Sequence, residues 1–412
     1  MGKSVSRCFQ RLKKSPIPLA RFAPSGYFTF LVKKQIPCIG TGRRAQQYPG
    51  YNPTHTNDPT AVADPPAFTN LAKPWSSLAP HIATPMETFD WAVSCSAAFR
   101  DHGDARVITV TDGAKLLAVA PMIRIGRGLN ARLEQAGMPR LYEPTDLVAT
   151  DQSSLTRLAD ALLKTGTPFM LGRLPASSPA VETIKKTCKG RGLVYERTQA
   201  TYPYIPLDEK WKEPEQNISQ RRRSDIRRAS RHAEKLGPVS IQMFCPTHSE
   251  VDEAVERAMS VEAKSWKGEE GYDMASDKPV GDFFREYTHR AARSGSLRLS
   301  FMNIGEHVAA MQIGIVHANR FWVLKVGYDP EFQKASPGIL LMIEAIKYAV
   351  AQGLETYELL GTAADWTRVW TEHERESVSL RVYPANIRGG VALATDAITK
   401  FGQKLNRART SS

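Results

Sequence analysis

The sequence predicts an α/β protein with two lobes, each built around a mixed sheet. Helical and extended patterns alternate from about residue 81 onwards, which is typical of this class. Three alternating segments between residues 297 and 328 predict an antiparallel meander, followed by an amphipathic helix and one more strand. The 412 residues are enough for two or three domains. Because no apolar run reaches the roughly 18–20 residues that a membrane-spanning helix needs, we expect no integral membrane protein.

The net charge of +13 comes mainly from the first part of the chain. Residues 1–57 contain ten lysines and arginines and no acidic residue, so the remaining residues carry 45 basic and 42 acidic side chains. The excess of positive charge therefore says little about what the folded part binds. We expect no specific nucleic-acid partner.

Residues 1–80 are predicted to form a disordered, basic and proline-rich tail. Seven prolines between residues 49 and 80 argue against regular elements there. The acid-free start, rich in arginine and serine, leaves several interpretations open. It could be an organelle transit peptide, an arm for anionic membranes, a disordered extension or a wrongly assigned start.

Residues 81–212 are predicted to form the first lobe. Thr84 and Glu87 have the spacing of a capping box at the start of a helix that continues to Phe99. Asp112-Gly113 is the turn of a hairpin between two apolar strands. The remaining predicted elements are a helix over 153–165, a strand over 169–174, a helix over 178–191 and a strand from residue 193.

Residues 213–385 are predicted to form the second lobe, and residues 386–412 a C-terminal helix and tail. A first helix over 217–236 ends at Gly237-Pro238, which is a strong stop signal. The elements expected after it are a strand over 239–244, helices over 249–266 and 280–293, meander strands over 297–302, 308–316 and 321–328, a helix over 339–350 and a strand over 356–360.

The cysteines and histidines exclude two classes of small stabilised domain. The five cysteines are scattered without a CxxC pair, and the nine histidines include no HExxH motif. This pattern argues against a disulfide scaffold and against a zinc site of the usual spacing. We therefore expect no metal cofactor, and a reducing, cytoplasmic compartment.

Six stretches of the second lobe follow one another in a characteristic order. They are Arg221–Arg231, Glu262–Gly268, Leu297–Val316, Lys325–Pro330, Ser336–Leu341, and Glu358–Gly361 followed by Trp370. Together they resemble the GCN5-related N-acetyltransferase (GNAT) superfamily, in the branch of CelD-like polysaccharide proteins that is related to the FemAB peptidyltransferases. The resemblance covers about residues 80–385. It implies two GNAT-like lobes in tandem, of which the second binds an acyl-CoA co-substrate.

The loop before the helix at residue 339 is the candidate donor site. Backbone N–H groups at a helix N-terminus can bind the pyrophosphate of an acyl-CoA. Gly338 lets the backbone approach closely, whereas Pro337 favours a helix start but supplies no N–H. Ala335-Ser336 stands where the commoner motif has its first glycine, so that motif is incomplete. The predicted co-substrate-binding residues of this loop are Gln333, Ser336, Gly338 and Ile339.

Val326, Gly327 and Tyr328 end the third strand of the meander. In the fold that the chain resembles, this strand parts from the next one at a bulge, and the thioester lies in the gap. Backbone N–H groups there can stabilise the oxyanion that forms when an amine attacks. Gly327 is the residue type that a bulge favours. Tyr328 is predicted either to protonate the departing thiolate or to pack as an ordinary aromatic residue.

Glu262 is the leading candidate for the general base, because its helix lies beside the cleft in the resembled fold. Asp329, Glu358 and Asp365 are weaker candidates. Each of these carboxylates could instead be merely solvated.

The candidates for substrate binding begin with the arginine-rich helix. Residues 224, 227, 228 and 231 share one helical face, which could grip phosphates of CoA, of a lipid-linked saccharide or of a nucleotide-activated substrate, or could simply be solvated. Thr367 stands where the resembled branch usually has lysine, which puts substrate identity in doubt. The predicted substrate-binding residues are Trp266, Lys267, Asp329, Arg368, Trp370 and Arg227.

The resemblance implies an acyl-CoA-dependent acyltransferase, most simply an N-acetyltransferase. Its acceptor would be an amine on a sugar or on a precursor of the cell envelope or of an exopolysaccharide. A peripheral association with membrane-bound polysaccharide machinery stays open. Two alternatives also stay open: a FemAB-type transferase that uses an aminoacyl-tRNA, and an inactive scaffold of the same fold.

Overall fold

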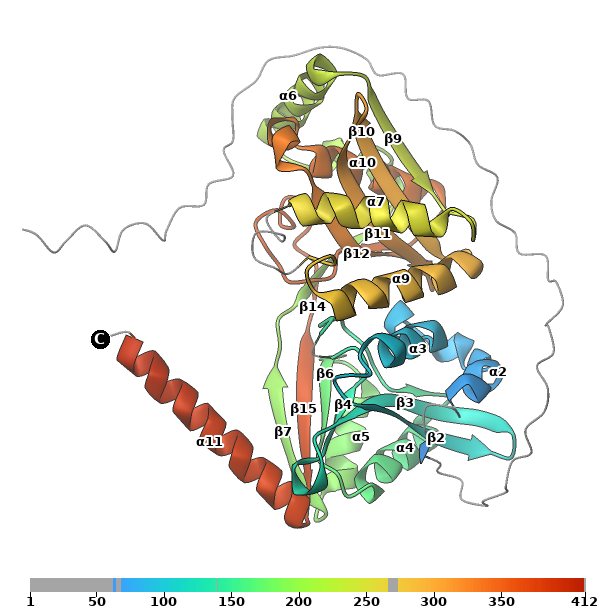
Figure 1. Ribbon diagram of the computed structural model, residues 1–412, viewed down its shortest axis with the longest axis vertical. Helices are drawn as coiled ribbons and strands as arrows, with labels where there is room; N and C mark the ends of the chain where they lie inside the picture. The colour runs from blue at the N-terminus through green and yellow to red at the C-terminus, as the bar shows by residue number, and fades with distance from the viewer. Residues whose placement is uncertain (1–61, 64–67, 139, 266–272, 411–412) are drawn as a thin grey trace, which may run out of the picture.

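The computed structural model describes residues 62–63, 68–138, 140–265 and 273–410. Most of the predicted tail lies outside these ranges, so its roles stay predictions. The described residues form two lobes stacked along the long axis of the molecule, each with one sheet (Figure 1). This arrangement confirms the predicted α/β class with two lobes.

The first sheet has eight strands, of which all but one lie in a single row. In sheet order they are β1 (Val62–Ala63), β2 (Asp104–Asp112), β3 (Lys115–Ile125), β4 (Arg132–Gln135), β6 (Phe169–Pro175), β15 (Ser377–Pro384) and β7 (Gly192–Thr198), and β5 (Val148–Ala149) pairs with β3. Strands β2, β3 and β4 form an antiparallel meander, and β6 runs parallel to β4. The helices of this lobe are α2 (Ala72–Ser76), α3 (Phe89–Ala98), α4 (Gln152–Lys164) and α5 (Pro179–Cys188).

The second sheet has seven strands and repeats this plan. In sheet order they are β14 (Glu374–Arg375), β8 (Tyr202–Pro206), β13 (Thr356–Glu358), β12 (Arg320–Tyr328), β11 (His307–His317), β10 (Leu297–Ile304) and β9 (Val239–Phe244). Strands β10, β11 and β12 are the predicted meander, and β13 runs parallel to β12. The helices are α6 (Gln220–Leu236), α7 (Val251–Lys264), α9 (Lys278–Arg293) and α10 (Pro337–Ala351).

The two lobes exchange a strand. Strand β8 precedes the predicted boundary at residue 212, yet it pairs with β13 in the second sheet. Strand β15 precedes the predicted boundary at residue 385, yet it pairs with β6 and β7 in the first sheet. Each predicted boundary therefore assigns one strand to the wrong lobe. Local sequence patterns do not show which distant strands pair with one another.

Helices cover both faces of the second sheet. Side chains alternate along β12, so Trp322 packs in one apolar cluster with α7 and α9, while Phe321 packs in another with α10. The α9 face also receives α3 of the first lobe, since the Trp91 ring lies 4.7 Å from the Phe283 ring. This contact connects the two lobes through an apolar core.

Residues 68–80 differ from the expectation of a disordered tail. They contain α2 and two 3-10 turns, Thr69–Leu71 and Ala79–His81. Trp75 is 1 % exposed, and its indole N–H donates a 3.2 Å hydrogen bond to the Glu87 carbonyl. The proline count misled the prediction here, because apolar side chains between the prolines are buried against the first sheet.

The predicted C-terminal helix is present as α11 (Ile387–Thr410). It leaves the end of β15 and points away from the body of the molecule (Figure 1). Asp396 anchors its first half, because its carboxylate forms ion pairs with Arg132 and Arg381 at 2.6 and 2.8 Å.

Candidate active site

A gap opens in the second sheet where β12 and β13 part. The two strands pair at only three positions, ending with Trp322 opposite Glu358. Strand β13 stops there, whereas β12 continues to Tyr328 with only β11 beside it. The parting of strands that the resemblance implied is therefore present.

The bulge lies three residues before Gly327, not at it. The register between β11 and β12 shifts where Ile313 faces Lys325 and Gly314 faces Val323, so Leu324 is the extra residue. Gly327 itself pairs regularly with Met311. A bulge turns two consecutive side chains to the same face. Leu324 accordingly packs in the α7 and α9 cluster, and Lys325 reaches the same helices.

Gly327 is needed for a different reason, the close approach of helix α7. A Cβ atom at position 327 would lie 3.0 Å from the Glu262 Cα and 3.3 Å from the Met311 methyl carbon. Two of the predicted site residues, Glu262 and Gly327, are thus in direct contact.

Glu262 is fully buried on the α7 face of the sheet. Its Oε2 accepts a 3.0 Å hydrogen bond from the Met274 N–H, and its Oε1 lies 3.6 Å from the Lys325 Nζ. Lys325 is 19 % exposed, and its ammonium lies 5.2 Å from the Phe284 ring. A buried carboxylate is costly unless it is paired and hydrogen-bonded, and both conditions are met here.

Lys325 was not assigned a role from the sequence, although it stands in the Lys325–Pro330 stretch that carried the resemblance. Strict alternation predicts that it points away from Leu324. Only the bulge brings it to Glu262, and no local signal in the sequence marks that bulge.

Tyr328 lies on the opposite face of β12. It packs with the cluster of Ala335 and Leu341, and its ring comes within 3.9 Å of the position that a Cβ on Gly338 would take. The two predicted catalytic residues, Glu262 and Tyr328, therefore flank the end of β12 from different sides.

Asp329 is a structural cap in this structure. It is 3 % exposed, its Oδ1 accepts a hydrogen bond from the Glu331 N–H, and its Oδ2 pairs with the Lys264 Nζ at 2.9 Å. Its hydrogen bond raises the pKa of Lys264. The carboxylate starts the turn Pro330–Ala335 and ties it to α7, so its lone pairs are engaged by the protein itself.

The loop before α10 has an unusual helix start. Ser336 adopts a left-handed backbone with φ of 45°, and among the described residues no side chain caps the helix N-terminus. Instead the Ser336 carbonyl accepts from the N–H groups of Ile339 and Leu340. Gln333 is exposed, Ile339 is 37 % exposed and Gly338 is partly exposed. The four predicted loop residues thus surround an accessible helix N-terminus.

The remaining predicted residues have different environments. Trp266 and Lys267 lie outside the described residues. Trp370 is 5 % exposed in the core beside α10, so its side chain packs there. Arg368 is exposed and lines an open hollow of about 460 Å³ together with Ser219 and Arg222. Val326 is 37 % exposed on the end of β12.

Two of the weaker base candidates have other environments. Glu358 is fully buried, and Arg375 donates to both of its oxygens at 3.1 and 2.7 Å. Asp365 has a fully exposed side chain, 3.7 Å from Arg368. Of Glu262, Glu358 and Asp365, only Glu262 is buried in direct contact with the end of β12 where it parts from β13.

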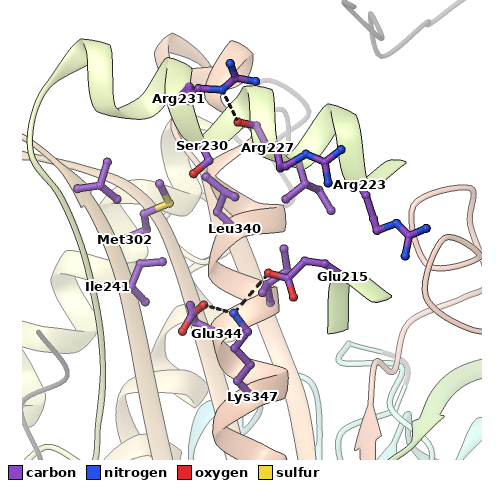
Figure 2. Close-up of a pocket in the computed structure, with 13 residues that line it drawn as sticks. Glu215, Arg223, Arg227, Ser230, Arg231, Ile241, Met302, Leu340, Glu344 and Lys347 are labelled. Carbon is purple, nitrogen blue, oxygen red and sulfur yellow. Dashed lines mark hydrogen bonds and ion pairs between the residues drawn. The ribbon is translucent and has the colours of Figure 1, made fainter. Parts of the chain in front are cut away.

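The arginine-rich helix α6 lies across the N-terminal end of α10 (Figure 1). The sequence predicts one exposed face made of residues 224, 227, 228 and 231. Arg228 is only 3 % exposed, so it does not belong to that exposed face. The arginines that face outwards together are Arg223, Arg227 and Arg231, and they line a cavity of about 200 Å³ between α6, α10 and the edge of the sheet (Figure 2).

The described residues hold neither a metal cluster nor a membrane span. No three histidine, cysteine, aspartate or glutamate side chains in these ranges could hold a metal ion. In the same ranges, every helix is too short or too polar to cross a bilayer.

The parted strands of the second sheet thus have a helix N-terminus on one face and a buried carboxylate on the other. Residues 220–368 match the family model described as an acetyltransferase (GNAT) domain. The second lobe therefore contains a region similar to GNAT acetyltransferase domains.

The chain is similar to several solved structures, of which FemX supports the fold. FemX is 12 % identical, and the match covers 76 % of this chain and 96 % of that one with a TM-score of 0.54. A protein of unknown function from Bacteroides thetaiotaomicron is 10 % identical over 76 % and 97 % of the two chains, with a TM-score of 0.49. L-PGS from Bacillus licheniformis is 12 % identical over 73 % and 92 %, with a TM-score of 0.46. No curated protein matches the sequence.

Proposed function

We propose that this enzyme transfers an acyl group, in the simplest case acetyl, from acyl-CoA to an amine by direct attack on the thioester. The observation that carries the proposal is the gap beyond Trp322 and Glu358, with Glu262 on one side of it and the start of α10 on the other. We place the thioester in that gap, with the attacking amine on the α7 face and the pyrophosphate at the helix N-terminus.

The two faces of β12 suit the two proton transfers. The attacking amine forms the new C–N bond and loses a proton to the Glu262 Oε1, while the Lys325 ammonium compensates the buried charge. The C–S bond breaks, and the thiolate leaves towards α10, where Tyr328 can donate its phenolic proton. Glu262 and Tyr328 thus act on opposite sides of the same strand.

The donor is tested by titrating the full chain with acetyl-CoA and with free CoA in a calorimeter. We expect both to bind, and Gly338→Leu to abolish binding without unfolding the protein, because a Cβ at 338 meets nothing closer than 3.9 Å. Gly390→Leu is the matched control, since it lies on α11 with open space around it. Binding that survives in Gly338→Leu would remove the loop from the donor site.

One observation favours a second donor class, an aminoacyl-tRNA. The outward arginines of α6 form no ion pairs with described carboxylates, and Thr367 stands in place of the expected lysine. A phosphate backbone binds such a surface with strong salt dependence. If the folded protein gives no heat with any acyl-CoA but binds charged tRNA, the donor is an aminoacyl-tRNA and not an acyl-CoA.

The acceptor proposal rests on the resemblance to CelD-like proteins. We infer an amino sugar, or an amine on an envelope or exopolysaccharide precursor, used in the cytoplasm beside membrane-bound polysaccharide machinery. Release of free CoA with amino sugars, compared with release with amino acids, tests it. Equal or greater turnover of amino acids would contradict it.

A further inference from the structure

The cavity beside α6 has one apolar side and one cationic side. Met302 on β10 pairs with Ile241 on the neighbouring strand β9, and the two side chains form the floor of the cavity. Leu340, in the first turn of α10, forms a wall. Above them Arg223, Arg227 and Arg231 follow one another along α6 (Figure 2).

The cavity exists because α6 changes its packing along its length. Ala233 is fully buried and brings the helix close to Met302. One turn earlier, the small polar Ser230 faces the same sheet edge and leaves room above the apolar floor. A longer apolar side chain at this position would fill the space.

The three arginines lack partners that would account for their arrangement. Arg227 donates to the Ser224 hydroxyl, and Arg231 donates to the Arg227 carbonyl, both within the helix. Among described residues, none of the three guanidinium groups forms an ion pair with a carboxylate. Since like charges at i and i+4 destabilise a helix, a ladder of three is suited to an anion that binds between them.

The far end of the cavity has the opposite charge. Lys347 pairs with Glu344 at 2.9 Å and with Glu215 at 3.3 Å, which leaves one carboxylate charge in excess (Figure 2). An anionic group is repelled from this end and attracted to the arginine ladder. The cavity therefore orients a ligand that carries its negative charge at one end.

We propose that this cavity binds a phosphorylated amphiphile, with the phosphate on Arg223, Arg227 and Arg231 and its apolar chain on the floor of Met302, Ile241 and Leu340. The cavity touches the first turn of α10 at Leu340 and extends to the β9 edge of the sheet, away from the place where β12 and β13 part. The phosphate ester can come from a bilayer lipid or from a soluble or carrier-borne ester.

Decyl phosphate, titrated into the full chain and compared with inorganic phosphate, tests the proposal. We expect inorganic phosphate to bind about tenfold or more weakly, because it lacks the apolar contribution. The double variant Arg223→Gln/Arg227→Gln should weaken decyl phosphate binding about tenfold or more. Ser230→Leu should do the same by filling the cavity. Arg221→Gln is the matched control, because Arg221 is exposed on the same helix and does not line the cavity.

Circular dichroism establishes that each variant is folded. Equal decyl phosphate binding in the wild type, the double variant and Ser230→Leu would overturn the proposal, as would equally tight binding of inorganic phosphate. Vesicles of phosphatidylglycerol in phosphatidylcholine distinguish the sources. Vesicle binding that is lost in the double variant supports the site with a bilayer lipid as ligand. Variant-sensitive binding of decyl phosphate alone supports it with a soluble or carrier-borne ester.

Discussion

The two lobes use the same order of meander, helix and parallel strand, but they differ in what lies where the parallel strands part. In the first lobe β4 and β6 pair at two positions and then part, as β12 and β13 do. There the chain fills the gap itself. The Gln135 side chain accepts from the Gly172 N–H at 3.3 Å, and Met138 packs so closely that a Cβ at Gly172 would lie 2.3 Å from its methyl carbon.

The helix that connects the two parallel strands, α4 in the first lobe and α10 in the second, also differs between the lobes. Asp151 caps α4 by accepting a 2.8 Å hydrogen bond from the Ser154 N–H, and this bond lowers the pKa of Asp151. In the second lobe the corresponding Ser336 offers no side-chain cap. A carboxylate of the protein thus occupies the anion position at α4, whereas no side chain of the described residues does so at α10.

The largest effect is expected at Glu262. Glu262→Gln keeps the shape of the side chain but removes the proton acceptor, so we expect kcat to fall about 10²- to 10⁴-fold with acyl-CoA binding retained. Steady-state kinetics and calorimetry on the same preparation check this. Glu253→Gln, on the exposed side of α7, should leave kcat unchanged. A Glu262 variant with wild-type kcat would assign the base to another group.

Buried carboxylates provide a second contrast between the lobes. Glu262 and Glu358 in the second lobe lie beside cations, whereas Glu87 in the first lobe lies beside Asp146. Burial, with the Asp146 charge adding to it, raises the pKa of Glu87 to about 7 from 4.5. The folded state therefore favours the protonated carboxyl, and its contribution to stability is lost as pH rises from 4.5 through 7.

For a shift of this size, the loss amounts to about 3 kcal/mol of unfolding free energy. Glu87→Gln cannot ionise, so its stability relative to wild type should rise by about that amount between pH 4.5 and pH 8. Chemical denaturation across this pH range measures the difference. Glu182→Gln, at an exposed site on α5, should show no comparable rise. A constant difference between Glu87→Gln and wild type would contradict the shift.

The contact between α7 and the parted strand can be disturbed with one methyl group. Gly327→Ala places a Cβ 3.0 Å from the Glu262 Cα, so helix and strand must separate. We expect a loss of about 1–3 kcal/mol in stability together with reduced kcat. Gly338→Ala is the control, because its Cβ has room and its stability should match wild type. Thermal unfolding of both variants measures the loss of stability. Equal stability of Gly327→Ala and Gly338→Ala would contradict the close contact between α7 and β12.

The meander, its following helix and the glycine loop could be predicted from the sequence, because each is encoded locally. Alternating residues mark β10 to β12, and Ser336-Pro-Gly338 marks the start of α10. Lys325 was missed because a bulge reverses the direction that alternation assigns to it. The strand exchange of β8 and β15 depends on pairing between distant segments, which no window of sequence contains.

The smallest effect is expected when the helix caps of the two lobes are exchanged. Ser336→Asp introduces at α10 the carboxylate that Asp151 supplies at α4, and aspartate tolerates the left-handed backbone found at this position. We expect stability to change by less than about 1 kcal/mol. Acyl-CoA binding should weaken about tenfold, because the new carboxylate lies at the helix N-terminus and repels the pyrophosphate.

Asp151→Asn is the reciprocal change in the first lobe. Asparagine still caps the helix, so stability should change little, and acyl-CoA binding should equal that of wild type. Calorimetry of the two variants against acetyl-CoA compares the lobes directly. If Asp151→Asn weakens binding and Ser336→Asp does not, the donor lies in the first lobe despite its filled gap. Loss of binding only in Ser336→Asp assigns the donor to the second lobe, whose helix start has no side-chain cap in the wild type.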